Sequence, residues 1–199
     1  MVDSTQTDDY TDRLRRLRGA WWKRLLPVQW PYHHNLRRQH LGITLDVGCG
    51  LGRNLPALLP GSLGVDHNPT SIQLARQAGH DAMTVEEFLA SDRAMPGSFD
   101  SLLFAHVLEH LDADSGRALL EQYLPYLRPG GSVFFICPQE WGYRTDATHV
   151  RFVTDADLVA LAKQVGLQAG QPYSFPFHRW AGRLFIYNEF CLKAAAPDA

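Results

Sequence analysis

Residues 45–54 read LDVGCGLGRN: an apolar run leads into three glycines that stand at every second position. Gly48, Gly50 and Gly52 let the backbone adopt positive φ and approach a ligand closely, because glycine has no Cβ. Asp66 stands twenty residues after Asp46, at the end of the next apolar run. A carboxylate at a strand end can accept hydrogen bonds from both hydroxyls of a ribose. The turn and the acid together predict a binding site for an adenosine-containing ligand.

Apolar runs alternate with helix-like segments on both sides of this turn, which indicates strands and helices in alternation. We expect an α/β fold: a Rossmann-like, doubly wound, mainly parallel seven-stranded sheet with helices on both faces and an antiparallel last strand. The expected strands are 43–47, 63–65, 82–84, 99–105, 133–137, 167–175 and 183–192, and the expected helices are 54–59, 69–78, 115–127 and 155–166. The Ala-rich tail, 194–199, is expected to fray.

The first 42 residues have a different pattern from the rest of the chain. An apolar stripe over 9–26 and a short segment over 33–40 predict helices, with arginines on the other faces of the first. We expect 1–42 to form an N-terminal helical cap that closes over the ligand as a lid, and 43–199 to form the main domain. The formal net charge of −2 gives no support for nucleic acid as a partner.

Two cofactors could use the glycine-rich turn. A dinucleotide fingerprint, GxGxxG, would need its third glycine at position 53, which is Arg53. The carboxylate of Asp46 would oppose a pyrophosphate, but it suits the amino group or the sulfonium of S-adenosylmethionine. Charge therefore favours the methyl donor over a dinucleotide.

Four segments in the expected order resemble the class I S-adenosylmethionine-dependent methyltransferases. They are the motif I turn at 45–54, the ribose-binding motif GVD at 64–66, the fourth-strand motif from SFD at 98–100 to HVLEHL at 106–111, and LRPGG at 127–131. The resemblance covers about residues 43–165.

The resemblance implies a position for each part of the cofactor. Its amino-acid end would lie near Asp46 and the glycines Gly48, Gly50 and Gly52. Asp66 would hold the ribose and His67 would lie beside the adenine. His106 would end the fourth strand next to the sulfonium and the acceptor. Thr84, Val85 and Glu86 would lie along the adenine edge, although many family members carry an acid at the position of Thr84.

The segment from His106 to His110 also reads HxxEH, the inverted zinc-protease motif. Two histidines four residues apart on a helix can share a zinc ion. This segment follows a buried strand instead, and no distant acidic ligand is evident. We therefore expect no metal, and we interpret Glu109 and His110 as residues that hydrogen-bond within the loop.

The loop 139–153 carries the densest polar chemistry after the fifth strand, and loops at this end of a sheet often carry function. Asp146 and His149 could form a base with its orienting carboxylate, or could only stabilise the turn before the next helix. His106 is the other candidate base. The segment 174–180, rich in aromatic residues, could contact an acceptor or simply connect two edge strands.

These features predict an S-adenosylmethionine-dependent methyltransferase that acts on a small-molecule acceptor, at oxygen rather than nitrogen. The alternatives are a catalytically silent cofactor-binding module and, with less support, an NAD(P)-dependent oxidoreductase. Cys49, Cys137 and Cys191 form no CxxC pair, no apolar run is long enough to cross a membrane, and the first twelve residues are polar. We therefore expect a cytoplasmic protein without a membrane partner; the sequence does not indicate an oligomeric state.

Overall fold

The computed structural model describes residues 29–198. The strands are β1 Thr44–Val47, β2 Leu63–Asp66, β3 Ala82–Thr84, β4 Phe99–Ala105, β5 Leu127–Pro138, β6 Gln168–Ala169, β7 Tyr173–Phe175 and β8 Glu189–Ala195. The α-helices are α3 Trp30–Arg38, α4 Pro69–Gln77, α5 Val85–Leu89, α6 Ala113–Tyr123, α7 Glu140–Arg144 and α8 Asp155–Gln164. The 3₁₀ helices are η1 Leu55–Ala57, η2 Leu108–His110, η3 Leu124–Tyr126 and η4 Arg179–Arg183.

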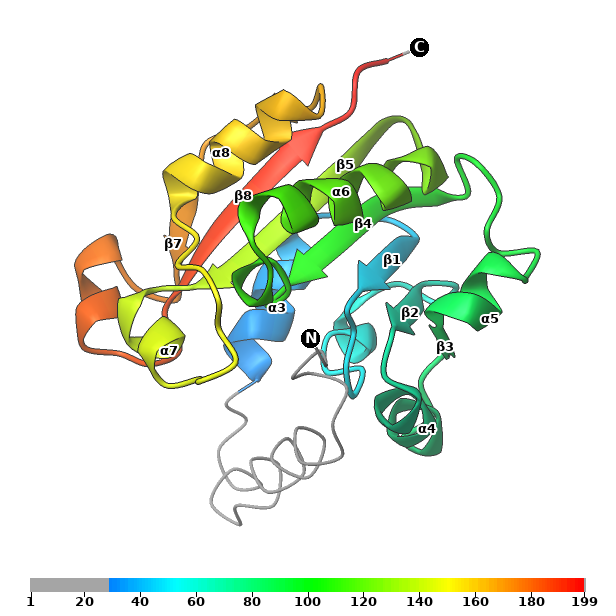
Figure 1. The fold of residues 1–199 in the computed structure, drawn as a ribbon, viewed down its shortest axis with the longest axis horizontal. Helices are drawn as coiled ribbons and strands as arrows, with labels where there is room; N and C mark the ends of the chain where they lie inside the picture. Colours follow the sequence, from blue (N-terminus) through cyan, green and yellow to red (C-terminus); the bar gives the residue numbers. More distant parts are fainter. Residues whose placement is uncertain (1–28, 199) are drawn as a thin grey trace.

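The strands form one sheet in the order β3-β2-β1-β4-β5-β8-β6, with β7 also paired to β8 (Figure 1). The first five strands in this order are mutually parallel, and β8 runs antiparallel to β5. This confirms the expected mainly parallel sheet with an antiparallel last strand. The order also places the carboxyl ends of β1, β2, β3 and β4 at one edge, where ligands bind in open α/β sheets.

The expected strand 167–175 is split into two short strands, so the described sheet has eight strands in place of seven. Both β6 and β7 pair with β8, one near each of its ends. Between them, the Gly170 N–H donates to the carbonyl of Lys193, and Pro172 has no N–H to donate. The pairing of β6 with β8 therefore continues to Gly170, and Pro172 cannot donate to the ladder before β7 begins.

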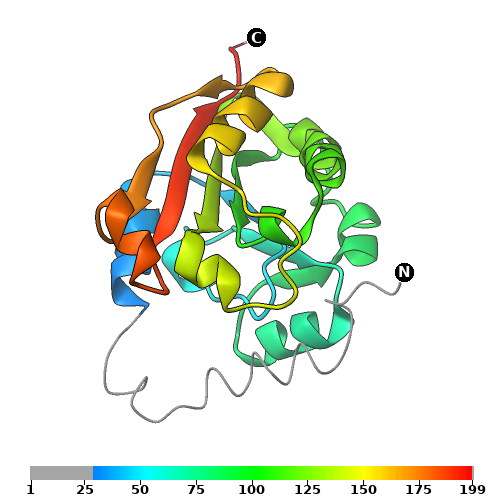
Figure 2. The same cartoon turned by 60° about the vertical axis from the view of Figure 1, so that its left-hand side comes forward.

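Helices cover both faces of the sheet, as Figures 1 and 2 show for α6 and α8 on one face and α3 on the other. Leu102 and Phe104 of β4 belong to the cluster that packs against α5, α6 and α8. Their neighbours Leu103 and Ala105 belong to the cluster that includes Leu36 of α3. Successive side chains of a strand point to opposite faces, so the apolar run of β4 is buried on both sides, as expected.

Several boundaries differ from the expected ones. The segment 54–59 forms only the 3₁₀ helix η1. The expected closing strand 183–192 begins at Glu189, because η4 ends at Arg183 and a turn closed by the Asn188 N–H and the Phe185 carbonyl follows it. It continues to Ala195, so the first residues of the Ala-rich tail are ordered. The expected helix 9–26 lies outside the described residues, as does most of the expected cap. No helix among residues 29–198 has the length and apolar character needed to span a bilayer.

Candidate functional site

The glycine-rich turn leaves β1 with three glycines in the left-handed region, at φ of 73° for Gly48, 53° for Gly50 and 72° for Gly52. The N–H of Gly48 donates to the carbonyl of Val65 at 2.7 Å, which ties the turn to β2. A Cβ at Gly48 would lie 2.5 Å from Val107 Cγ2, whereas a Cβ at Gly50 would meet nothing within 4 Å. Gly48 is therefore required for packing, while Gly50 borders open space that a ligand can occupy.

Asp66 joins this turn to the end of β2. Its Oδ2 accepts a hydrogen bond from the Gly50 N–H and its Oδ1 accepts one from the Asn68 N–H, each at 2.8 Å. Asn68, not Asp66, caps α4, because the Asn68 side chain accepts from the N–H groups of Thr70 and Ser71. Each carboxylate oxygen can accept a further hydrogen bond. The structure thus brings together the turn and the acid that the sequence singled out.

Asp46 lies on β1, two residues before the first glycine of the turn, and is only 1 % exposed. Its Oδ1 has no hydrogen-bond partner among the described residues, and its Oδ2 lies 3.5 Å from Asn54 Nδ2. Burial raises the pKa of Asp46 to about 7; the Asn54 hydrogen bond lowers it and the nearby charge of Asp66 raises it further. Burying a carboxylate without a full set of partners costs folding free energy unless a cation or a hydrogen-bond donor reaches it.

The residues expected beside the adenine lie where β2 and β3 end: His67 follows β2, and the segment 84–86 begins at the last residue of β3. Thr84 pairs in register with Asp66, so the segment 84–86 begins beside that carboxylate. The Thr84 hydroxyl accepts from the Glu87 N–H while Glu87 accepts from the Thr84 N–H, which forms a capping box for α5. Val85 and Glu86 form the first turn of this helix. On the other side, Nδ1 of the partly exposed His67 lies 3.6 Å from Asp66 Oδ1.

His106 ends β4 with φ at 59°, a conformation that is uncommon for a side chain other than glycine. Its Nδ1 lies 3.2 Å from Glu109 Oε1 and its Nε2 lies 2.8 Å from Glu189 Oε1. Burial opposes the charge, but hydrogen bonds to both carboxylates raise the pKa of His106 to about 10. The side chain is 43 % exposed, so water screens part of this attraction. His106 is therefore an imidazolium held between two acids at neutral pH.

Glu189 is a partner of His106 that the sequence analysis missed. It lies at the start of β8, more than 80 residues from His106. The one local signal is a charged residue that precedes the apolar run FCL at 190–192. The pairing with His106 depends on β8 lying next to β5, which no local pattern reveals.

The polar loop after β5 places His149 and Asp146 in different hydrogen-bond systems. The Nδ1–H of His149 donates to the carbonyl of Tyr143 at 2.7 Å, and the two rings stack. Asp146 Oδ1 accepts from the N–H and the hydroxyl of Thr148, at 3.0 and 2.7 Å. Tyr143 thus orients the His149 ring, and Asp146 shapes the turn that presents it.

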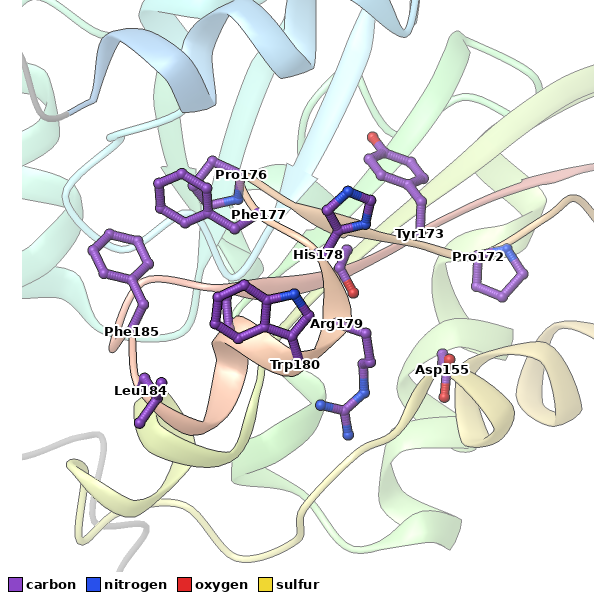
Figure 3. Close-up of a pocket in the computed structure, with 12 residues that line it drawn as sticks. Asp155, Pro172, Tyr173, Pro176, Phe177, His178, Arg179, Trp180, Leu184 and Phe185 are labelled. Carbon is purple, nitrogen blue, oxygen red and sulfur yellow. The ribbon is translucent and has the colours of Figure 1, made fainter.

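A separate pocket of about 820 Å³ lies beside η4 and the end of β7, and it includes no residue of the glycine turn (Figure 3). Figure 3 shows Phe177, Trp180 and Phe185 gathered on one side. Trp180 is 67 % exposed. Arg179 forms a two-pronged ion pair with Glu140, at 2.8 and 2.6 Å. The aromatic segment 174–180 is therefore more than a packed connection, because it borders an open cavity.

Comparisons with known proteins agree with this geometry. A family model described as a methyltransferase domain matches residues 45–133, which hold the glycine turn, Asp66 and the end of β4. No curated protein matches the chain.

Solved structures match over nearly the whole chain. A SAM-dependent methyltransferase from Archaeoglobus fulgidus is 18 % identical, with 94 % of this chain and 100 % of that chain covered and a TM-score of 0.68. The magnesium protoporphyrin IX methyltransferase from Synechocystis PCC 6803 with bound SAH is 16 % identical, with 98 % of each chain covered and a TM-score of 0.66. The N-methyltransferase NodS from Bradyrhizobium japonicum WM9 in complex with SAH is 19 % identical, with 94 % and 98 % covered and a TM-score of 0.64.

These structures show the fold, and the family model covers the segment that carries the glycine turn. The chain thus has the Rossmann-like fold of these methyltransferase structures, and residues 45–133 match the model of a methyltransferase domain.

Proposed function

We propose that the chain transfers a methyl group from S-adenosylmethionine to an oxygen of a small-molecule acceptor. The observation that carries the choice of donor is Asp46, whose buried Oδ1 has no hydrogen-bond partner in the described part of the chain and lies below the open turn at Gly50. A cationic amino group or sulfonium would stabilise this carboxylate, whereas a pyrophosphate would be repelled by it.

Each part of the donor has a matching group in the site. Asp66 would accept hydrogen bonds from the ribose hydroxyls with the lone pairs that Gly50 and Asn68 leave free. His67 and the segment 84–86 would border the adenine, with contacts from Val85, Glu86 and the backbone, because the Thr84 hydroxyl is used in the α5 cap. His106 would lie near the reacting methyl group, held in place by Glu109 and Glu189.

When bound, S-adenosylmethionine supplies a methyl group that its positive sulfur has already activated. The chain's own contribution is to hold the acceptor in line with that group and to exclude water. Proximity and orientation of this kind can contribute about 7–11 kcal/mol to lowering a barrier. The pocket beside η4 offers aromatic walls for part of an acceptor.

An acceptor hydroxyl would also need to lose its proton. His149 suits this role better than His106, because a carbonyl accepts from its Nδ1–H and leaves Nε2 as the basic nitrogen. His106 is already protonated at neutral pH, because the carboxylates of Glu109 and Glu189 stabilise its imidazolium form. Asp146 supports the base indirectly through Thr148.

A turnover assay tests this proposal. It measures the release of S-adenosylhomocysteine in the presence of a panel of small acceptors that bear hydroxyl or amine groups. We expect turnover with a hydroxyl acceptor, reduced about 10²–10⁴-fold by His149→Ala at saturating donor, because a positioned base contributes that much. His40→Asn, at the opposite edge of the sheet before β1, should match the wild type. Donor binding with no turnover on any acceptor would instead identify a silent cofactor-binding module, and equal turnover by both variants would remove His149 from the mechanism.

A further inference from the structure

A cluster of metal-ligating side chains lies next to the proposed cofactor site and outside it. One ligand atom each from Glu109, His110 and His149 lies within 4.8 Å of the other two. The two imidazole rings meet edge to face with their centroids 4.8 Å apart. Residues from two separate loops, after β4 and after β5, thus converge on one point.

The hydrogen bonds of the two imidazoles fix which nitrogen each ring can offer to an ion. His149 Nδ1 lies 2.7 Å from the carbonyl of Tyr143, and His110 Nδ1 lies 3.2 Å from the carbonyl of Thr148. His110 Nδ1 also lies 3.2 Å from the Thr148 hydroxyl, but that hydroxyl donates its proton to Asp146 Oδ1 at 2.7 Å. A carbonyl oxygen can only accept, so each Nδ1 carries the proton and Nε2 is the basic nitrogen of each ring. Metal-binding histidines typically have this arrangement, in which a backbone carbonyl orients the ring.

Glu109 supplies a second, independent observation. Its side chain is fully buried, and its Oε2 accepts no hydrogen bond of ordinary geometry among the residues that the structure describes. The Cys137 thiol, a weak donor, lies close enough for Glu109 to contribute to raising the pKa of that thiol. Its Oε1 is bonded to His106. A buried carboxylate oxygen without a partner is costly, and a cation beside His110 and His149 would satisfy it.

The backbone holds the two loops together at this point. The carbonyl of Glu109 accepts hydrogen bonds from the N–H groups of Val150 at 2.8 Å and Arg151 at 3.1 Å. Together with the bond from His110 to Thr148, these contacts fix the two loops before any ion is present. Tetrahedral zinc ligands lie roughly 3.3–3.5 Å apart, so modest side-chain rotations would complete the site.

We propose that Glu109, His110 and His149 bind a divalent first-row transition ion, with two imidazoles and one carboxylate as ligands. This donor set is typical of zinc and related ions in sites that keep open coordination positions. It differs from the pairing that the HxxEH motif indicates, because His106 is held by Glu109 and Glu189 instead of facing His110.

The site lies beside the cofactor turn. Val107, two residues before Glu109, is the side chain that a Cβ at Gly48 would strike. If the proposed function holds, an ion here would take an acceptor oxygen in an open position and lower its pKa so that the proton passes to solvent water, and His149 would then serve as a ligand of the ion in place of acting as the base. The role in methyl transfer therefore rests on the proposed function, while ion binding does not.

Calorimetric titration of the chelator-treated chain with Zn²⁺ tests the site. We expect one equivalent to bind, and His110→Ala and His149→Ala to weaken binding by at least about 100-fold, because loss of an outer-shell partner alone costs 10–100-fold. His40→Asn is the matched control and should bind as the wild type does. Glu109→Gln keeps an oxygen for His106 but loses the charge, and it should weaken binding as well.

Absence of wild-type Zn²⁺ binding, or equal binding by the cluster variants and His40→Asn, would overturn the proposal. S-adenosylmethionine affinity is measured on the same samples, and a thermal melt of each variant reports whether it is folded. Zn²⁺ binding that depends on the cluster, without donor binding, would support this site and refute the proposed function. Donor binding without Zn²⁺ binding would refute only this site.

Discussion

At the scale of single residues, Asp46 is the side chain whose chemistry depends most on what the site binds. It is buried, short of hydrogen-bond partners and close to Asp66, and its pKa is raised to about 7. The fold therefore disfavours its ionised form. The resulting loss of stability is absent below a pH of about 4, grows as the pH rises towards 7, and is constant above that.

A cation beside Asp46 would reverse this preference. We expect S-adenosylmethionine to bind more tightly as the pH rises from 5.5 to 6.8, a range that ends about one unit below the pKa of about 7.7–8.0 of an α-amino group. Asp46→Asn should bind more weakly and lose this pH dependence, since it cannot ionise. The same variant should unfold at a higher temperature at pH 8, with up to roughly 4 kcal/mol of unfolding free energy recovered.

Calorimetry at several pH values and thermal melts of both proteins measure these effects. Asp66, Asn54 and Cys49 also face this carboxylate, so Asp46→Asn is compared with the wild type at each pH. Parallel pH profiles for the two proteins would show that Asp46 does not meet the charged end of the ligand.

At the scale of elements, Gly50 of the glycine turn can be compared with Gly79, which has a similar backbone conformation outside the site. Gly50 and Gly79 both have positive φ, at 53° and 84°, and a Cβ at either would meet nothing within 4 Å. Gly79 ends α4, whereas Gly50 borders the proposed cofactor. Substitution of either glycine by alanine should lower the free energy of unfolding by about 1–2 kcal/mol, because a side chain is disfavoured in the left-handed region.

Only one of these two substitutions should affect the ligand. Gly50→Ala places a methyl group where the donor would lie, so we expect at least a tenfold loss of S-adenosylmethionine affinity, while Gly79→Ala keeps wild-type affinity. Thermal melts report the shared stability cost, and calorimetry reports the difference. Equal affinities for the two variants would mean that the open space at Gly50 is not part of the cofactor site.

The elements also show what a local pattern can and cannot predict. The strand β4 and the helix α8 were predicted because an apolar run and the Thr154 capping box are local signals. Helix α5 was missed although Thr84 and Glu87 form a capping box, because the same residues were interpreted as the adenine edge. The start of β8 was placed too early because a turn, closed by the Asn188 N–H and the Phe185 carbonyl, separates the end of η4 from the strand.

At the scale of the whole molecule, the order of the sheet is what assembles the site. Asp46, Asp66 and His106 end up together because β1 lies between β2 and β4. The sequence predicted these three residues, since each follows an apolar run. It could not predict Glu189 or the cluster of Glu109, His110 and His149, because those contacts join loops and strands that are distant along the chain.

The pocket that we propose for part of the acceptor depends on the same long-range packing. The pocket beside η4 combines Asp155 at the start of α8 with residues of β7 and η4, whose proximity arises only in the folded sheet. Composition and spacing therefore predict the donor side of the reaction, and the folded structure is needed for the acceptor side.

The central claim is that the turn at 48–52 and Asp66 bind the adenosine of S-adenosylmethionine. Calorimetric titration of the wild type, Asp66→Ala and the exposed control Asp92→Ala with S-adenosylmethionine, S-adenosylhomocysteine and NAD tests it most directly. We expect the wild type and Asp92→Ala to bind one equivalent of the first two ligands and no NAD, and Asp66→Ala to bind about 10–150-fold more weakly, the value of hydrogen bonds to a charged group. Tighter binding of NAD, or equal affinities for the two aspartate variants, would contradict the account.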